Sequence, residues 1–242
     1  MPVADINQLT TKNRLLMAMS AADFALLAPH LVEVELVSGE TLIAPETPIT
    51  HSWFLEDGVC SIVATTPSGH QTEVGLIGRD GVVDTSAIHG TDRTPLLCFI
   101  QISGRGLRLR ADALSRANIA SPTLHKLMLR YAQSFFIQVA HTALTNASHT
   151  IAQRLARWLL MSQDRINANE VRLTHERLSL MLGVRRAGVT VAIQTLERAG
   201  IIAARRGSIA ITDRARLETY AADSYGAPEK EYHRLLGIAI KD

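Results

Sequence analysis

The sequence contains little cysteine: its 242 residues include two, Cys60 and Cys98. Two such residues make neither a disulfide framework nor a CxxC site, so we expect two small buried side chains in a reducing compartment. The start, MPVADINQ, lacks a basic segment followed by an apolar run, which predicts no secretory signal peptide. No apolar stretch approaches the roughly 18–20 residues of a membrane span. We therefore expect a cytoplasmic protein with no membrane partner.

Clusters of metal-ligating residues are also missing. His51, His70 and His89 are isolated in the sequence, and there is no HxH pair. Strand alternation would place His70 and Glu73 on opposite faces, whereas a cupin-like metal site requires clustered histidines and a carboxylate. We expect no catalytic residue, no metal and no cofactor. A cupin-like metalloenzyme is the least favoured alternative.

Charge is distributed unevenly, although the net charge is only +2. Residues 148–242 contain 15 Lys and Arg against 10 Asp and Glu, whereas residues 1–147 contain 10 against 13. The basic excess lies within residues 174–216, which hold 8 basic and 3 acidic side chains. This local excess favours a polyanionic partner for the C-terminal part alone.

Apolar spacing within the basic segment predicts a helix-turn-helix. Thr174 is a suitable N-cap, and Gly183 tolerates the left-handed backbone that a sharp turn between two helices requires. The second helix is expected at about 184–199, ending before Gly200. The apolar residues that would form the buried faces of the two helices are Leu178, Met181, Leu182, Val189, Ala192, Ile193 and Leu196. This spacing allows the steep crossing of a helix-turn-helix, with a plain helical hairpin as the alternative.

The remaining face of the second helix carries polar side chains suited to double-stranded DNA. Arg pairs with guanine and Gln with adenine in the major groove. Gly188 inside a helix costs up to about 1 kcal/mol relative to Ala, so we expect a close approach to DNA backbone there. Residues 201–212 predict a hairpin, or wing, whose arginines would contact phosphate. The predicted DNA-binding residues are Thr174, Arg177, Arg185, Arg186, Gly188, Thr190, Gln194, Arg205 and Arg206.

The N-terminal half changes from helical to strand-like periodicity. Residues 7–32 predict helix, with a start at residues 20–23, and strict alternation begins at Val32. Short strands are expected at 32–36, 41–44, 52–57, 59–66, 71–77, 97–103 and 106–110. Strands of this length and spacing favour a sandwich or roll, so the fold class is α+β.

A long helix is predicted from Pro122 to about residue 147, and it is apolar on more than one side. Such a helix must be covered from more than one side. We expect it to pack on its own roll and on a second copy, with a single buried core helix as the alternative. The predicted dimer-helix residues are Leu124, Leu127, Met128, Tyr131, Phe135 and Val139. A two-fold arrangement would suit two DNA half-sites about one turn apart.

The order of these elements, with the segment LTHERLSLMLGVRRAGVTVAIQTLERAGII from Leu173, resembles the Crp/Fnr family of bacterial transcription regulators. TIAQRLARWL from Thr150 resembles the family's helix after the dimer helix, and GETL from Gly39 and GRDG from Gly78 resemble roll motifs. The resemblance implies a β-roll sensor domain (1–120) of the jelly-roll, cyclic-nucleotide-binding type, a dimerisation helix (121–147) and a winged helix-turn-helix domain (148–242). It also implies a homodimeric, sequence-specific transcription regulator, with RNA polymerase as a further partner.

The resemblance implies that Arg186 reads a base and that Thr174 and Arg185 contact phosphates. Two other base-reading positions of the cyclic-AMP-responsive branch, a Glu and an Arg, correspond here to Ala187 and Val191. We therefore expect a different operator, read through Gln194, Thr190 and apolar contacts to thymine methyl groups.

The effector motif of that branch is not preserved. Where a Gly-Glu pair is expected the chain reads VDTS from Val83, and RTP from Arg93 replaces Arg-Ser/Thr-Ala. A carboxylate at Asp84 would repel a phosphate, and Pro95 lacks a backbone donor. The predicted effector pocket is Asp84, Thr85, Arg93 and Thr94, for an unidentified small molecule. The iron-sulfur branch's N-terminal cysteines are absent, and no haem ligand set is apparent.

The second alternative function is a small-molecule-binding module that does not contact DNA. The composition of the tail from Tyr220 predicts a short helix or a frayed end.

Overall fold

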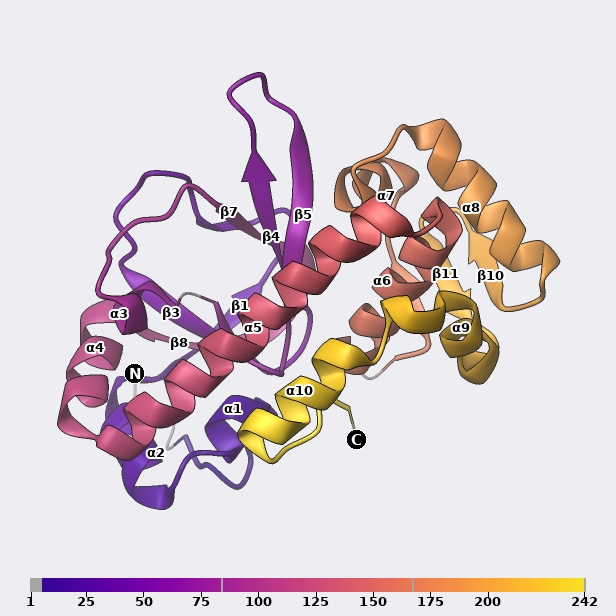
Figure 1. Cartoon of the computed structure of the whole chain (residues 1–242). Helices are drawn as coiled ribbons and strands as arrows, with labels where there is room; N and C mark the ends of the chain where they lie inside the picture. Colours follow the sequence, from indigo (N-terminus) through magenta and orange to yellow (C-terminus); the bar gives the residue numbers. More distant parts are fainter. Residues whose placement is uncertain (1–5, 84, 167, 242) are drawn as a thin grey trace.

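The computed structural model of the chain describes residues 6–83, 85–166 and 168–241. Figure 1 shows a β domain, a long helix α5 (Pro122–Ser148) that runs across it, and a C-terminal domain beyond the far end of that helix. The α+β fold class predicted from the sequence is confirmed.

The β domain is built from two antiparallel sheets. One has the strand order β1-β8-β3-β6 and the other β2-β7-β4-β5. The strands are β1 (Val32–Leu36), β2 (Thr41–Ile43), β3 (His51–Leu55), β4 (Val59–Thr65), β5 (Gln71–Ile77), β6 (Val82–Val83), β7 (Leu97–Ile102) and β8 (Gly104–Arg110). Alternate side chains of both sheets, such as Leu55 and Ile100, meet in one core. Each of the seven expected strands is present; the two-residue β6 was not predicted.

The N-terminal helical prediction is only partly correct. In place of helix over 7–32, the chain forms α1 (Arg14–Met17), α2 (Ala21–Leu27) and a 3-10 turn (Ala28–His30). Asn13 explains why helix begins only at Arg14: its side chain caps α1 and also donates to the carbonyls of Leu55 and Gly81, both at 2.8 Å. Ser20 caps α2 at the predicted start. Two further helices, α3 (Ser86–His89) and α4 (Ala111–Ala120), were not predicted.

Helix α5 begins at the predicted proline, with Ser121 as its N-cap. One face of α5 packs on the β domain. Tyr131 donates its hydroxyl to the carbonyl of Val82 at 3.1 Å, and Gln138 accepts the backbone N–H of Leu76 at 2.8 Å. The helix is therefore fixed to the strands of both sheets.

The C-terminal domain contains α6 (Ile151–Ile166), β9 (Glu170–Arg172), α7 (His175–Leu182), α8 (Arg186–Arg198), β10 (Ile202–Arg205), β11 (Ser208–Ile211) and α9 (Arg214–Ala221). Strand β11 lies between β10 and β9, so the predicted wing hairpin is extended by a third strand. After a 3-10 turn (Ala222–Ser224), α10 (Ala227–Leu236) returns to pack along α5, as Figure 1 shows. Within the described residues, no helix has the length and hydropathy needed to cross a membrane.

Candidate nucleic-acid interface

The helix-turn-helix is present as predicted, and local chemistry accounts for its turn. The hydroxyl of Thr174 accepts the N–H of Arg177 at 3.3 Å and so caps α7. Gly183 ends α7 with φ of +60°, in the left-handed region that glycine adopts without penalty. Leu178, Val189 and Leu196 are fully buried between the helices and α6. The two helices therefore share one core and hold α8 at a fixed angle.

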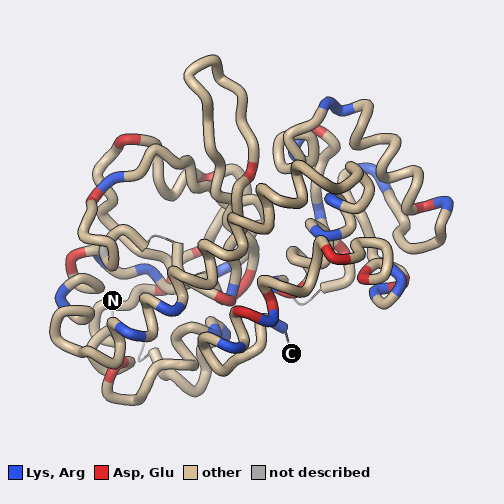
Figure 2. Tube along the Cα trace, in the orientation of Figure 1, with Lys and Arg blue, Asp and Glu red and all other residues tan. Residues whose placement is uncertain are grey.

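Helix α8 presents a cationic face to solvent. Arg185, Arg186 and Gln194 are exposed, and Val191 between them is 62% exposed. Figure 2 shows Lys or Arg at both ends of α8. Among the ion pairs formed by the described residues, none involves Arg185 or Arg186. These guanidinium groups are thus available to an external anion.

Two predicted contact residues on α8 are turned partly inward. A Cβ on Gly188 would lie 3.0 Å from Cδ1 of Ile151, so tight packing of α8 on α6 accounts for this glycine without DNA. Thr190 is half-buried, and its hydroxyl donates to the carbonyl of Arg186 at 3.1 Å. Both residues are less exposed to solvent than Arg186 and Gln194.

Arg177 does not point toward solvent as the prediction of a DNA contact requires. Its guanidinium donates to the hydroxyl of Ser38 and, at 3.1 Å, to the carbonyl of Gln101, both in the β domain. This contact was not predictable from sequence patterns, because Ser38 and Gln101 are 139 and 76 residues away along the chain. In this arrangement Arg177 joins the two domains.

The wing places two more arginines at an exposed edge. Arg205 and Arg206 are exposed, and Gly207, with φ of +79°, makes the turn between β10 and β11. The carboxylate of Glu197 on α8 accepts the N–H of Ala204 at 2.8 Å. This bond ties the wing to α8, so both cationic features belong to one rigid unit.

The β domain contains a cavity of about 140 Å³ at the predicted effector position. Thr85, Arg93 and Thr94 line it together, and Asp84 lies outside the described residues. Arg93 is 3.7 Å from Asp92 in an exposed ion pair. The remaining lining is mainly apolar: Ile43, Ile49, Ile62, Ile77, Leu96, Cys98 and Phe135, with Ser86, His89 and Thr91. Among the described residues, no group of three His, Cys, Asp or Glu side chains could hold a metal ion.

The predicted dimer-helix residues of α5 are divided between the core of their own chain and positions nearer the surface. Leu124, Met128 and Tyr131 are buried in the core of their own chain and cannot reach a partner. Leu127, Phe135 and Val139 are half-buried. The large apolar residues that α5 exposes are Leu129, Phe136 and Leu144, at 45%, 61% and 54%. Periodicity identified an apolar helix but could not decide which stripe the chain's own roll covers.

The C-terminal domain matches the model of the Crp-like helix-turn-helix domain over residues 153–220. FixK2 from Bradyrhizobium japonicum is 16% identical, with a TM-score of 0.67, covering 79% of this chain and 98% of its own. The c-di-GMP-responsive global regulator CLP of Xanthomonas campestris is 14% identical, with a TM-score of 0.64 and coverages of 79% and 99%. A Crp/Fnr-family regulator of Thermus thermophilus, TTHA1359, is 19% identical, with a TM-score of 0.63 and coverages of 78% and 97%. No curated protein matches the sequence.

These similarities and the geometry define a winged helix-turn-helix domain joined to a β domain. Residues 153–220 form a Crp-like helix-turn-helix domain, and the chain as a whole has the fold of the Crp/Fnr transcription regulators. The resemblance predicted from the sequence is therefore confirmed.

Proposed function

We propose that the protein is a homodimeric regulator that inserts α8 into the major groove of double-stranded DNA and places its wing on the backbone. The observation that carries this proposal is the exposed arginine pair at the start of α8, which forms no ion pair with the described residues. Arg186 would read a base, whereas Arg185, Thr174 and the wing pair Arg205 and Arg206 would contact phosphates. Arg177 could join them only after leaving its contacts on the β domain.

The domain division 1–120, 121–147 and 148–242 remains part of the proposal. Helix α5 supplies the dimer contact through Leu129, Phe136 and Leu144. Neighbouring residues of α5 then have separate tasks: Phe135 lines the cavity of the β domain, while Phe136 faces the partner. A ligand that moves Phe135 would change the dimer contact directly. RNA polymerase as a further partner, and a cytoplasmic location, stay predictions.

The effector that suits the cavity is a small, largely apolar molecule. The cavity offers about 140 Å³, comparable to a site that accepts a benzene-sized ligand. Arg93 and Thr94 at its polar side would favour a single anionic or hydrogen-bonding group. The c-di-GMP-responsive regulator among the similar structures indicates that this fold is not restricted to one effector.

The test is selection of bound sequences from random duplex DNA by the full-length protein. We expect an enriched pair of inverted half-sites whose centres lie about 10 base pairs apart, because a two-fold dimer presents two α8 helices on one side of the duplex. Failure to enrich any sequence, with only salt-sensitive non-specific binding, would contradict the proposal. Repeating the selection with small apolar acids tests the effector.

A further inference from the structure

The C-terminal domain is fastened to the β domain by buried polar contacts. Arg165 of α6 pairs with Asp80 at 2.7 Å, and both side chains are buried. Tyr232 of α10 donates to the carbonyl of Asp80 at 2.7 Å. Trp158 of α6 donates its indole N–H to Glu73 of β5 at 2.8 Å. Of these partners, Glu73 is the one whose charge is not matched by a direct ion pair among the described residues.

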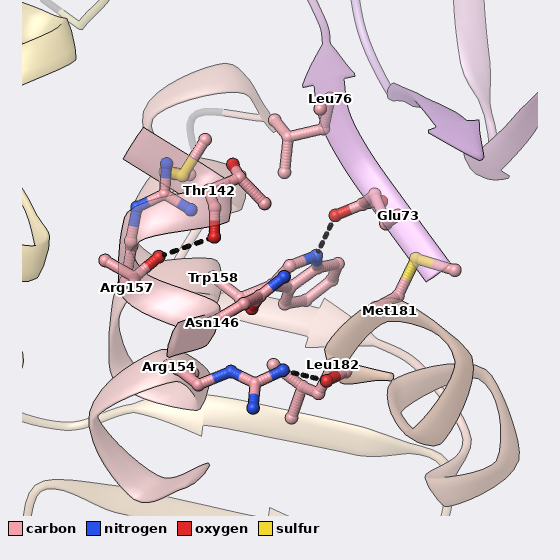
Figure 3. A pocket seen from close by; sticks show the side chains of 12 residues that line it. Glu73, Leu76, Thr142, Asn146, Arg154, Arg157, Trp158, Met181 and Leu182 are labelled. Carbon is pink, nitrogen blue, oxygen red and sulfur yellow. Dashed lines mark hydrogen bonds between the residues drawn. The ribbon is translucent and has the colours of Figure 1, made fainter. Parts of the chain in front are cut away.

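Glu73 is 5% exposed and lies where β4, β5, α5, α6 and α7 meet. Its second oxygen accepts the hydroxyl of Ser61 at 2.5 Å. Figure 3 shows the carboxyl group of Glu73 meeting the indole of Trp158, with Met181 of α7 beside them. The adjoining cavity measures about 20 Å³, enough for a single water molecule. The docked C-terminal domain therefore removes this carboxyl group from bulk solvent.

The charged groups that face Glu73 come mainly from α6. Arg157 and Arg165 act on it through space, and Arg154 lines the same cavity. Arg157 is itself 6% exposed, and burial lowers its pKa to about 10. Cys60 of β4 is a further titratable group that interacts with Glu73. Among the described cavity-lining residues, α5 supplies Thr142, Thr145 and Asn146 and α7 supplies Met181 and Leu182, none of which titrates.

We propose that Glu73 is a proton-operated latch, whose neutral form holds the DNA-binding domain on the β domain and whose ionised form releases it. Docking buries the carboxyl group against two neutral hydrogen-bond donors, with no direct ion pair to the arginines of α6 among the described residues, whereas undocking returns it to water. Burying a charge without a close counter-ion is costly, so docking and ionisation oppose each other.

The direction follows from linkage. Burial raises the pKa of Glu73 from the usual 4.5 to about 7, although the hydrogen bonds from Ser61 and Trp158 and the charges of Arg157 and Arg165 act the other way. In the undocked state this pKa would return toward its usual value. The contribution of protonated Glu73 to docking is therefore complete below pH 4.5 and is lost as the pH rises to about 7. Between pH 5 and 8 the docking equilibrium should weaken on the order of fiftyfold.

Release would matter for DNA binding because docking also holds Arg177 on Ser38 and Gln101. This consequence rests on the proposed function, whereas the latch itself does not. At rising pH the freed domain would offer Arg177 to phosphate, and its α8 could adjust to the spacing of two half-sites.

The experiment measures exchange protection of the Trp158 indole N–H by NMR in the full-length protein. The chain has two tryptophans, so Trp53→Phe assigns the signal. Glutamine cannot ionise, so Glu73→Gln is the reference for the wild type. The ratio of wild-type protection to protection in Glu73→Gln should fall on the order of fiftyfold between pH 5 and 8. Ser61→Ala removes a donor that favours the ionised form and should move the decline to higher pH. Melting curves of each variant establish that it folds.

Glu35→Gln is the matched control, since Glu35 is an exposed carboxylate of β1 in the same domain; its pH dependence should equal that of the wild type. The same decline in Glu73→Gln as in the wild type would overturn the latch. DNA affinity is measured separately: wild-type affinity should rise relative to Glu73→Gln as the pH increases. An absence of duplex binding by all variants would contradict the proposed function but leave the exchange result to decide the latch.

Discussion

In the proposed function, single side chains of α8 determine how much of the affinity for DNA depends on base sequence. Arg186 is exposed in the first turn of α8, with no ion pair among the described residues, and a bidentate contact to guanine is within its chemistry. Arg186→Ala should cost roughly 1–3 kcal/mol on the selected site and relax the preference at one base pair. Fluorescence anisotropy on the selected duplex and on a scrambled duplex measures both effects.

Arg185→Ala provides the comparison for Arg186. Arg185 is also exposed but lies at the N-cap of α8, where a phosphate contact is expected. Its loss should weaken binding to the selected and scrambled duplexes by similar factors. If Arg186→Ala showed the same uniform loss, its assignment as a base-reading residue would be wrong.

Residues whose conformation is set locally were predictable, and those set by distant partners were not. Thr174 and Gly183 follow from capping and left-handed backbone, and the structure has both as expected. Arg177 is a surface residue by sequence pattern, yet its partners Ser38 and Gln101 belong to another domain. Glu73 was considered only as a metal ligand, because nothing in the sequence places Trp158 beside it.

The wing and α8 form one structural unit. Strand β11 lies between β10 and β9, and the carboxylate of Glu197 on α8 accepts a backbone N–H of β10. Arg206 at its tip is exposed beside the left-handed Gly207. Arg206→Ala should weaken specific and random duplexes alike and make the salt dependence shallower by roughly one released counter-ion. Affinities at several salt concentrations give the slope; a slope equal to that of the wild type would remove Arg206 from the phosphate contacts.

Helix α5 leads to a prediction about assembly. Phe136 is 61% exposed on the stripe that also carries Leu129 and Leu144. Phe136→Glu would place a charge in the proposed dimer contact and should weaken association by about 2–4 kcal/mol. Analytical ultracentrifugation over a concentration series measures the shift toward monomer. Ile119→Glu, at an apolar residue of α4 that is 83% exposed, is the control and should leave assembly unchanged.

Whether a segment forms a helix or a strand was more predictable than which of its faces is buried. The strand at 32–36 was predictable because its residues alternate, whereas β3 and β4 are buried on consecutive residues and were predictable only as short apolar segments. Helix α5 was predictable because its apolar spacing extends over about seven turns. The residues of the predicted helix over 7–32 that precede Arg14 are not helical because the side chain of Asn13 caps α1 and donates to the β domain. Periodicity did not predict which face of α5 packs on its own chain. That face includes Tyr131, which donates a hydrogen bond to the carbonyl of Val82, and this contact cannot be read from the spacing of apolar residues.

At the scale of the whole molecule, the C-terminal segment connects the two domains by packing back on α5 and the β domain. The Crp-like domain ends at residue 220, and α10 beyond it returns to α5 and the β domain. Tyr232 is 3% exposed and joins the core that contains Leu15 and Tyr131. The sequence predicted a short helix or frayed end here, since mixed charge and Pro228 gave no indication of a docking partner. The tail thus adds a further connection between the domains, besides the chain passing from α5 into α6 and the contacts that α6 and α7 make with the β domain.

This connection makes the stability of the two domains interdependent. Tyr232→Ala should lower the free energy of unfolding by about 3–5 kcal/mol through the cavity it leaves, whereas Tyr232→Phe should cost about 0.5–1.5 kcal/mol through the lost bond to Asp80. Urea unfolding followed by far-UV circular dichroism measures both. His233→Ala, at the exposed neighbour on α10, should be nearly neutral. Because α10 bridges the domains, Tyr232→Ala should also split a single wild-type transition into two; a single transition with a cost below 1 kcal/mol would show that α10 does not hold the domains together.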